Sequence, residues 1–216
     1  HMAPNADMPT KAAQNDSFSL ANMVPQAPKN NQQVWRELEE ATRAIVTKQK
    51  QDVYVVTGPV FAGKKLKTIG NGVIVPTAVY KAVYMPKTGA IGAYYAPNDN
   101  SLKVRIVSVC YLEEQLGINL FPQLTEEQKR NTYRLPLTAK AVKANQKIEY
   151  SNWDAESQCA EDVSKENLQA LQRQFKFASS GSTSPAAGSA MDSATQDTIV
   201  KQLIDALLQY ILQLLK

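Results

Sequence analysis

The sequence is poor in the residues on which many metal and hydrolytic sites depend. Among 216 residues it has one histidine, His1, and two cysteines, Cys110 and Cys159. The cysteines have neither CxxC spacing nor a nearby histidine, which argues against a zinc site and against a cysteine nucleophile. Two cysteines fit one disulfide, Cys110–Cys159, in an exported protein, but they also fit two unrelated buried thiols in a cytosolic one.

Long apolar runs are also missing. No stretch of about 18 uncharged apolar residues occurs, so the sequence predicts no transmembrane segment, and no signal peptide is visible. The apolar content of 44% and the charged content of 20% are normal for a globular protein with a core. The net charge of +4 is compatible with a polyanionic partner but does not identify one.

Hydrophobic periodicity predicts an α+β fold. Residues 30–51 repeat apolar positions at helical spacing, and residues 10–16 predict a short helix. A helix is also expected at 112–116, ending at Gly117, and another at 161–175. Strand-like runs follow one another without intervening helices, so we expect an antiparallel sheet flanked by helices. These runs are residues 52–61, 72–86, 90–98 and 103–109.

The C-terminal part has a different composition. We expect a domain over residues 1–177, a flexible Gly/Pro/Ser-rich linker over 178–197 and an amphipathic Leu-rich helix over 198–216. An apolar seam at alternating 4-3 spacing runs along this last segment. Self-association or docking on a protein partner is the leading prediction for it; docking on its own domain and lying on a membrane surface are the alternatives. The seam residues are Val200, Ile204, Leu207, Ile211 and Leu214.

Several segments in one colinear order resemble the DNA/RNA non-specific endonuclease family, of the Serratia nuclease and endonuclease G type. The resemblance covers roughly residues 1–125. Its segments are HMAPNADM (1–8), LANMVPQ (20–26), NQQVWRELE (31–39), VYVVTGPVF (53–61), IVPTAVYKAVY (74–84) and LGINLFPQL (116–124). The family carries an Asp-Arg-Gly-His motif, of which this chain has only the histidine. The resemblance therefore implies that His1 is the family's catalytic histidine, not a tag remnant, and that the domain is truncated just before it.

The resemblance implies roles for five residues. His1 would be the general base, since an imidazole with a pKa of about 6.5 can accept a proton near neutrality. Asn31 would bind Mg²⁺, a hard cation that keeps several waters and needs few protein ligands; Mn²⁺ can substitute. Glu39 would hydrogen-bond the waters of the metal, and Arg43 would contact phosphate oxygens in the transition state. Asn22 would lie beside the substrate.

Plainer readings of the same residues are possible. Asn31 could cap the helix, and Glu39 with Arg43 could form an ordinary i,i+4 surface pair. Trp35 is predicted to be core rather than a stacking platform for bases. Lys64, Lys65 and Lys67 could be a solvated loop or could attract phosphate.

The resemblance thus implies a Mg²⁺-dependent endonuclease that cleaves DNA and RNA, with a ββα-metal fold in which a His-Asn finger holds the metal. The alternative is a truncated or degenerate nuclease domain that binds nucleic acid or protein through its C-terminal helix. A non-specific nuclease is dangerous to its own cytoplasm, so a periplasmic or secreted location is expected, with an organelle as the alternative.

Overall fold

The structure, a computed structural model, describes residues 1–161, which belong to one compact unit, His1–Asp162. The predicted helix at 161–175, the domain boundary at 177, the linker at 178–197 and the Leu-rich helix at 198–216 reach or lie beyond the end of this range. They remain predictions, and so does any partner bound through residues 198–216. No helix among the described residues is both long and apolar enough to cross a membrane.

The N-terminal quarter of the chain is helical, as the periodicity predicted. A π-helical turn runs directly into the longest helix, α2, which ends at Lys50 in a left-handed conformation (φ 51°). The short predicted helix is α1, and the Thr10 hydroxyl caps it by accepting a hydrogen bond from the Ala13 amide. The helical elements are η1 (Asn5–Asp7), α1 (Lys11–Asp16), η2 (Leu20–Asn22), η3 (Asn30–Trp35) and α2 (Arg36–Gln49).

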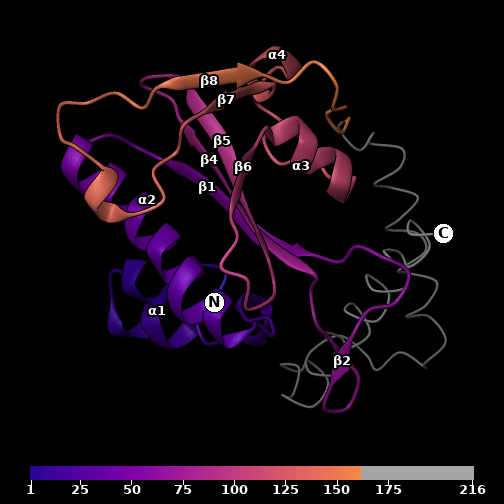
Figure 1. Cartoon of the computed structure of the whole chain (residues 1–216). Coiled ribbons are helices and arrows are strands. Elements are labelled where there is room, and N and C mark those ends of the chain that lie inside the picture. Colours follow the sequence, from indigo (N-terminus) through magenta and orange to yellow (C-terminus); the bar gives the residue numbers. More distant parts are fainter. Residues whose placement is uncertain (162–216) are drawn as a thin grey trace, which may run out of the picture. The chain divides into compact units, whose positions relative to one another are not determined.

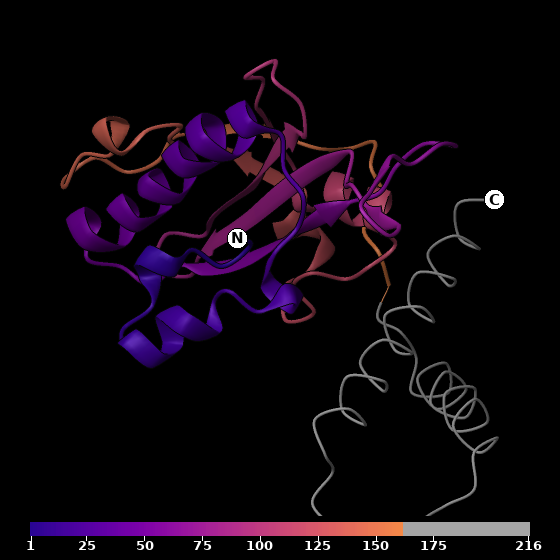
Figure 2. The same ribbon diagram turned by 90° about the horizontal axis from the view of Figure 1, so that it is seen from below.

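The predicted antiparallel sheet is confirmed. Four strands pair antiparallel in the order β1-β4-β5-β6, with α2 on one face and α3 on the other (Figures 1 and 2). The strands are β1 (Tyr54–Val60), β4 (Ala78–Met85), β5 (Ala90–Pro97) and β6 (Arg105–Val107). The connection from β1 to β4 forms a small hairpin of β2 (Thr68–Ile69) and β3 (Val73–Ile74), which projects from the sheet. Further along the chain, β7 (Asn131–Tyr133) pairs with β8 (Tyr150–Trp153).

Strand β4 is central and buried on both faces, so its alternating side chains enter two cores. Val79 and Val83 pack with α2, against Trp35, which is core as predicted. Tyr80 and Ala82 enter the other core, under α3. One residue of the α2-facing row is not apolar, and that residue helps to build the candidate site.

Helix α3 (Val109–Leu116) begins three residues earlier than predicted. The Ser108 hydroxyl caps it by accepting a hydrogen bond from the Tyr111 amide, and Gly117 ends it with φ 65°, as predicted. The remaining helical elements are α4 (Glu126–Lys129) and η4 (Ala139–Ala141).

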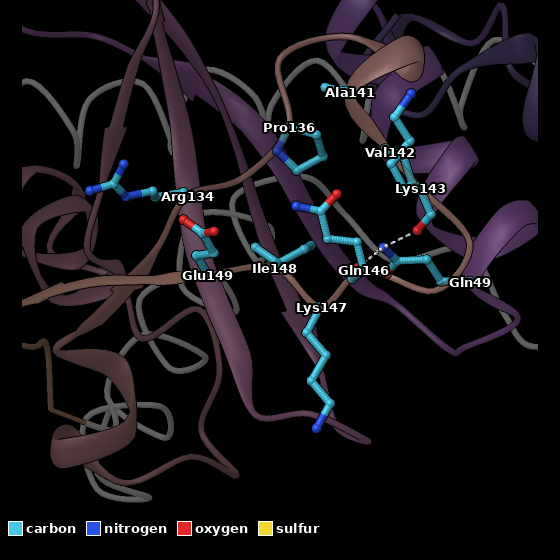
Figure 3. A pocket seen from close by; sticks show the side chains of 10 residues that line it. All are labelled: Gln49, Arg134, Pro136, Ala141, Val142, Lys143, Gln146, Lys147, Ile148 and Glu149. Atoms are coloured by element: carbon cyan, nitrogen blue, oxygen red, sulfur yellow. Dashed lines mark hydrogen bonds between the residues drawn. The ribbon is translucent and has the colours of Figure 1, made fainter.

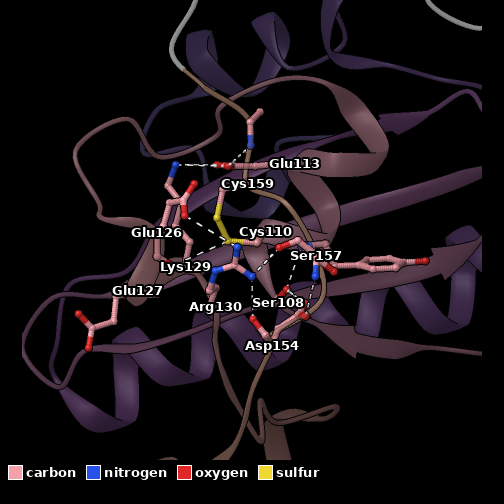
Figure 4. The surroundings of a disulfide bond; sticks show 12 residues. Ser108, Cys110, Glu113, Glu126, Glu127, Lys129, Arg130, Asp154, Ser157 and Cys159 are labelled. Carbon is pink, nitrogen blue, oxygen red and sulfur yellow. Dashed lines mark hydrogen bonds and ion pairs between the residues drawn. A yellow bond between two sulfur atoms is a disulfide. The ribbon is translucent and has the colours of Figure 1, made fainter.

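A disulfide joins Cys110 of α3 to Cys159 near the end of the described chain (Figure 4). Around it, the buried Lys129 and Glu113 form an ion pair of 3.0 Å, and Glu113 also accepts a hydrogen bond from the Ala160 amide. The disulfide and these polar contacts fix the segment that follows β8 against α3 and α4.

Candidate active site

A cleft of about 460 Å³ opens between the N-terminal segment, α2 and β1. Most of its lining is apolar, but six polar or charged side chains from four parts of the chain converge on it. A concave site with a few convergent polar groups is the usual form of a ligand site. The six are Asp7, Asn22, Glu39, Thr42, Thr57 and Lys81.

The N-terminal segment is held beside the cleft by Asn22. The Asn22 side chain accepts from the Ala3 amide (2.8 Å) and donates to the carbonyls of Ala3 and Ser17 (both 2.9 Å). The Met2 amide also donates to the Asn22 carbonyl, and the Met2 side chain is buried. In this structure Asn22 therefore positions the first three residues, and its contact with a substrate remains a prediction.

His1 lies beside the start of the long helix rather than among the lining residues of the cleft. Its carbonyl accepts a hydrogen bond from Trp35 Nε1 (3.2 Å), one helical turn beyond Asn31. Its imidazole packs edge-on against the Phe18 ring, with 4.8 Å between the centroids. Its Nε2 is buried and has no hydrogen-bond partner among the described residues. A buried nitrogen in this condition calls for a water or a ligand.

Asn31 lies inside the helix and is exposed, so the capping alternative is wrong. Helical geometry already begins at Pro28, and the Asn31 amide donates to the Ala27 carbonyl (2.9 Å). The neighbouring Asn30 is buried and bonds both Gln26 and the Pro97 carbonyl. Asn30 thus fixes this turn, and the side-chain amide of Asn31 is left facing solvent. Single π-helical turns are frequent at functional sites.

Glu39 and Lys81 provide charge within the cleft. Lys81 is the polar member of the α2-facing row of β4 and is only 2% exposed. Its Nζ donates to the Thr57 hydroxyl (3.1 Å) and lies 5.1 Å from the centre of the Trp35 ring. Burial lowers the pKa of Lys81 to about 8, although Glu39 and Asp7 both oppose this shift. Burial also raises the pKa of Glu39, and Lys81 and then the His1 α-amino group oppose that rise.

Arg43 does not pair with Glu39 in the way that its i,i+4 spacing suggested. Its partner is Asp7, with 2.5 Å between Arg43 Nε and Asp7 Oδ1, and both side chains stay partly exposed. The surface pair on this helix is instead Arg36 with Glu40, at 3.9 Å. Lys64, Lys65 and Lys67 are exposed and lie outside the lining of the cleft.

The structure therefore brings Asn22, Glu39, Asp7 and Lys81 to one cleft, with Arg43 joined to it through Asp7. His1 contacts Trp35, and Asn31 lies one turn earlier on the same helix; neither residue is in that lining. Sequence reasoning missed Asp7 and Lys81 as site residues. For Lys81 a signal existed, since a lysine two residues from both Val79 and Val83 breaks an apolar row.

The residues present fit a loosely held divalent cation. The described part of the chain has no group of three or more His, Cys, Asp or Glu side chains that could hold a metal ion together. Magnesium nevertheless keeps several waters and can bind through one protein oxygen and substrate phosphate. The exposed Asn31 amide and the unpaired His1 Nε2 suit such a site.

Comparison with known proteins gives consistent matches. The model of the DNA/RNA non-specific endonuclease family matches residues 1–127. The mitochondrial nuclease EXOG of Danio rerio is 36% identical over 149 residues, covering 59% of this chain and 43% of that protein. The human mitochondrial endonuclease G is 32% identical over 133 residues, covering 53% and 44%.

A nuclease of the cyanobacterium Nostoc sp. is 32% identical over 142 residues, which cover 58% of this chain and 50% of that protein. Among solved structures, a crystal structure of the EndoG/EndoGI complex matches with a TM-score of 0.51 and 27% identity, covering 60% of this chain and 61% of that chain. The chain thus spans about half the length of the curated relatives that it matches.

Proposed function

We propose, from the premise that this chain belongs to the DNA/RNA non-specific endonuclease family, that it is a magnesium-dependent endonuclease acting on both DNA and RNA with little sequence preference. The observation that carries the proposal is the cleft that groups Glu39, Lys81 and the Asp7–Arg43 pair along the helix that bears Asn31. In this proposal the segment from His1 to Asn31 is the His-Asn finger of a ββα-metal site.

Each residue has a defined task in the hydrolysis. Asn31 would hold Mg²⁺ or Mn²⁺, which when bound supplies positive charge for the phosphoryl oxygens and the leaving oxygen. His1, with a free Nε2, accepts the proton of the attacking water. Arg43 contacts a non-bridging phosphate oxygen. The Glu39 carboxylate orients water in the cleft, and Lys81 favours its ionised form.

Degradation of plasmid DNA and of RNA by the purified chain tests the proposal. With Mg²⁺ both substrates are expected to be lost, with no preferred cleavage sequence, and with EDTA both should survive. A chain that is folded by circular dichroism but leaves both substrates intact in Mg²⁺ would contradict the proposal.

Asp7→Asn is expected to tighten the binding of an oligonucleotide by about 3- to 10-fold at low salt. The carboxylate of Asp7 occupies the Arg43 guanidinium and also repels phosphate, so its neutralisation frees one cation and removes one anion. Fluorescence anisotropy in EDTA measures this without cleavage. The matched control is Asp16→Asn, which changes the same charge on exposed α1. Equal effects of the two variants would mean that net charge alone explains the tighter binding and that the Asp7–Arg43 pair plays no special part.

We place the protein in the periplasm or outside the cell, with an organelle as the alternative. The Cys110–Cys159 disulfide supports an oxidising compartment. EXOG and endonuclease G are named as mitochondrial, which is in keeping with the organellar alternative.

A further inference from the structure

A basic surface lies at the C-terminal end of α2. It consists of Arg134, Lys140, Lys143 and Lys147 from the segment between β7 and β8, and Lys87 from the turn between β4 and β5. All five are exposed, and none forms an ion pair with another described residue. From residue 129 to residue 148 the chain has six cations and no acid, so this charge is not compensated locally.

This basic surface is hollowed. Two adjoining hollows of about 200 and 170 Å³ share Gln49, Gln146, Lys147 and Ile148 in their lining. Arg134, Lys143 and Lys147 line the first hollow, against one carboxylate, Glu149 (Figure 3), and Lys87 lines the second. A concave positive surface concentrates the field and attracts anions more strongly than scattered lysines do.

The backbone under the lysines is fixed by the end of α2. Gln49 Nε2 donates to the carbonyls of Lys143 (3.1 Å) and Gln146 (2.9 Å), as the dashed lines in Figure 3 show. Lys48 Nζ donates to the carbonyl of Ala139 (2.7 Å). The buried Val142 anchors the same loop in the core. A fixed loop lowers the entropy lost when its side chains bind a ligand.

Helix α2 connects the cleft with the basic surface. Thr42 lines the cleft and Gln49 lines both hollows. Seven residues of helix rotate the chain by about two full turns, so these residues share one face, roughly 10 Å apart along the axis. Nucleotides along one strand of a duplex rise by about 3.4 Å each, so a strand that runs along α2 from the cleft would reach the hollows about three nucleotides further on.

We propose that the basic surface is a second phosphate-binding site, which holds the backbone of a DNA or RNA strand about three nucleotides from the cleft. Four of its five cations, all except Lys87, lie beyond residues 1–127, which the family model matches. The inference rests on the proposed function for the identity of the ligand, but binding can be measured without cleavage. Its ligand is the sugar–phosphate backbone, so the contacts carry no sequence preference.

The test is the affinity of the full chain for a fluorescent 20-base-pair DNA duplex in EDTA, measured over a range of salt concentrations. The double variant Lys143→Gln, Lys147→Gln is expected to bind about 10-fold more weakly. Its plot of log K against log salt should also be less steep by about 1.8, as expected for two lost phosphate contacts. The control, Lys11→Gln with Lys103→Gln, removes the same charge from exposed positions elsewhere and should leave the slope nearly unchanged.

Substrate length gives a second readout in Mg²⁺. The Lys143 and Lys147 variant should cleave a dinucleotide, which is too short to reach from the cleft to the second site, as fast as the parent, but a 20-base-pair duplex about 10-fold more slowly. Unchanged affinity in EDTA, or an equal loss in the control pair, would overturn the second site. A chain that binds as expected but never cleaves would instead overturn the proposed function and leave the second site standing.

Discussion

Asn31→Ala is expected to reduce Mg²⁺-dependent cleavage by about 100- to 1000-fold while leaving the thermal midpoint unchanged. A bound cation contributes several kcal/mol to stabilising the charge of the transition state, and each 1.4 kcal/mol corresponds to about tenfold in rate. The Asn31 side chain is exposed and makes no hydrogen bond to another described residue, so its loss should not affect stability. Initial rates on plasmid DNA and a thermal melt measure the two effects.

The adjacent Asn30 is a matched control. It is 2% exposed and its side chain makes two hydrogen bonds, so Asn30→Ala should cost about 1–3 kcal/mol of unfolding free energy. Activity per folded molecule should largely survive. His1→Ala should resemble Asn31→Ala, with a loss of about 100-fold or more and unchanged binding of oligonucleotide in EDTA. If Asn31→Ala instead loses stability and keeps its activity, Asn31 is a structural residue.

Local pattern predicted the long helix and the four-stranded sheet, but it did not predict β2, α4, β7 or β8. The periodic apolar positions of residues 30–51 predicted the long helix, and strand-like runs without intervening helices predicted antiparallel pairing. One local signal was overlooked: a proline is preferred in the first turn of a helix, and Pro28 begins this one. Asn31 is therefore one turn too far along the chain to be the cap.

Spacing could predict the candidate site only where it lies on one helix, and Asn22 was predicted from the family resemblance alone. Spacing and family resemblance together singled out Asn31, Glu39 and Arg43, because eight and twelve residues of helix fix their relative positions. The Arg43–Asp7 pair joins residues 36 apart, and Lys81 reaches the cleft from the middle of the sheet. No periodicity specifies such juxtapositions, because they depend on how helix, sheet and N-terminal segment pack.

Lys81→Met is expected to lower kcat/KM at pH 7 by about 10- to 100-fold, since a charged hydrogen-bonding group in a site contributes about 1.5–3 kcal/mol. Its ammonium opposes the rise of the Glu39 pKa and adds positive charge to a cleft proposed to bind phosphate. Because its own pKa is about 8, the parent chain should lose activity as the pH rises through 8. That alkaline limb should be absent from the pH–rate profile of Lys81→Met.

The pH dependence of the unfolding free energy gives an independent check, and proton linkage fixes the direction in which it changes. The pKa of Lys81 falls from 10.5 in an unfolded chain to about 8 in the folded one, so between these values the unfolded chain binds more protons. The Lys81 contribution to the unfolding free energy therefore rises from pH 8 to pH 10.5, and urea unfolding of Lys81→Met should lack this rise.

Thr57→Val, which removes the hydrogen-bond partner but keeps the charge, should retain both the alkaline limb and the rise. If Lys81→Met keeps the alkaline limb, the group titrating near pH 8 is not Lys81, and the buried lysine then serves the core beside Trp35 rather than the chemistry of the cleft.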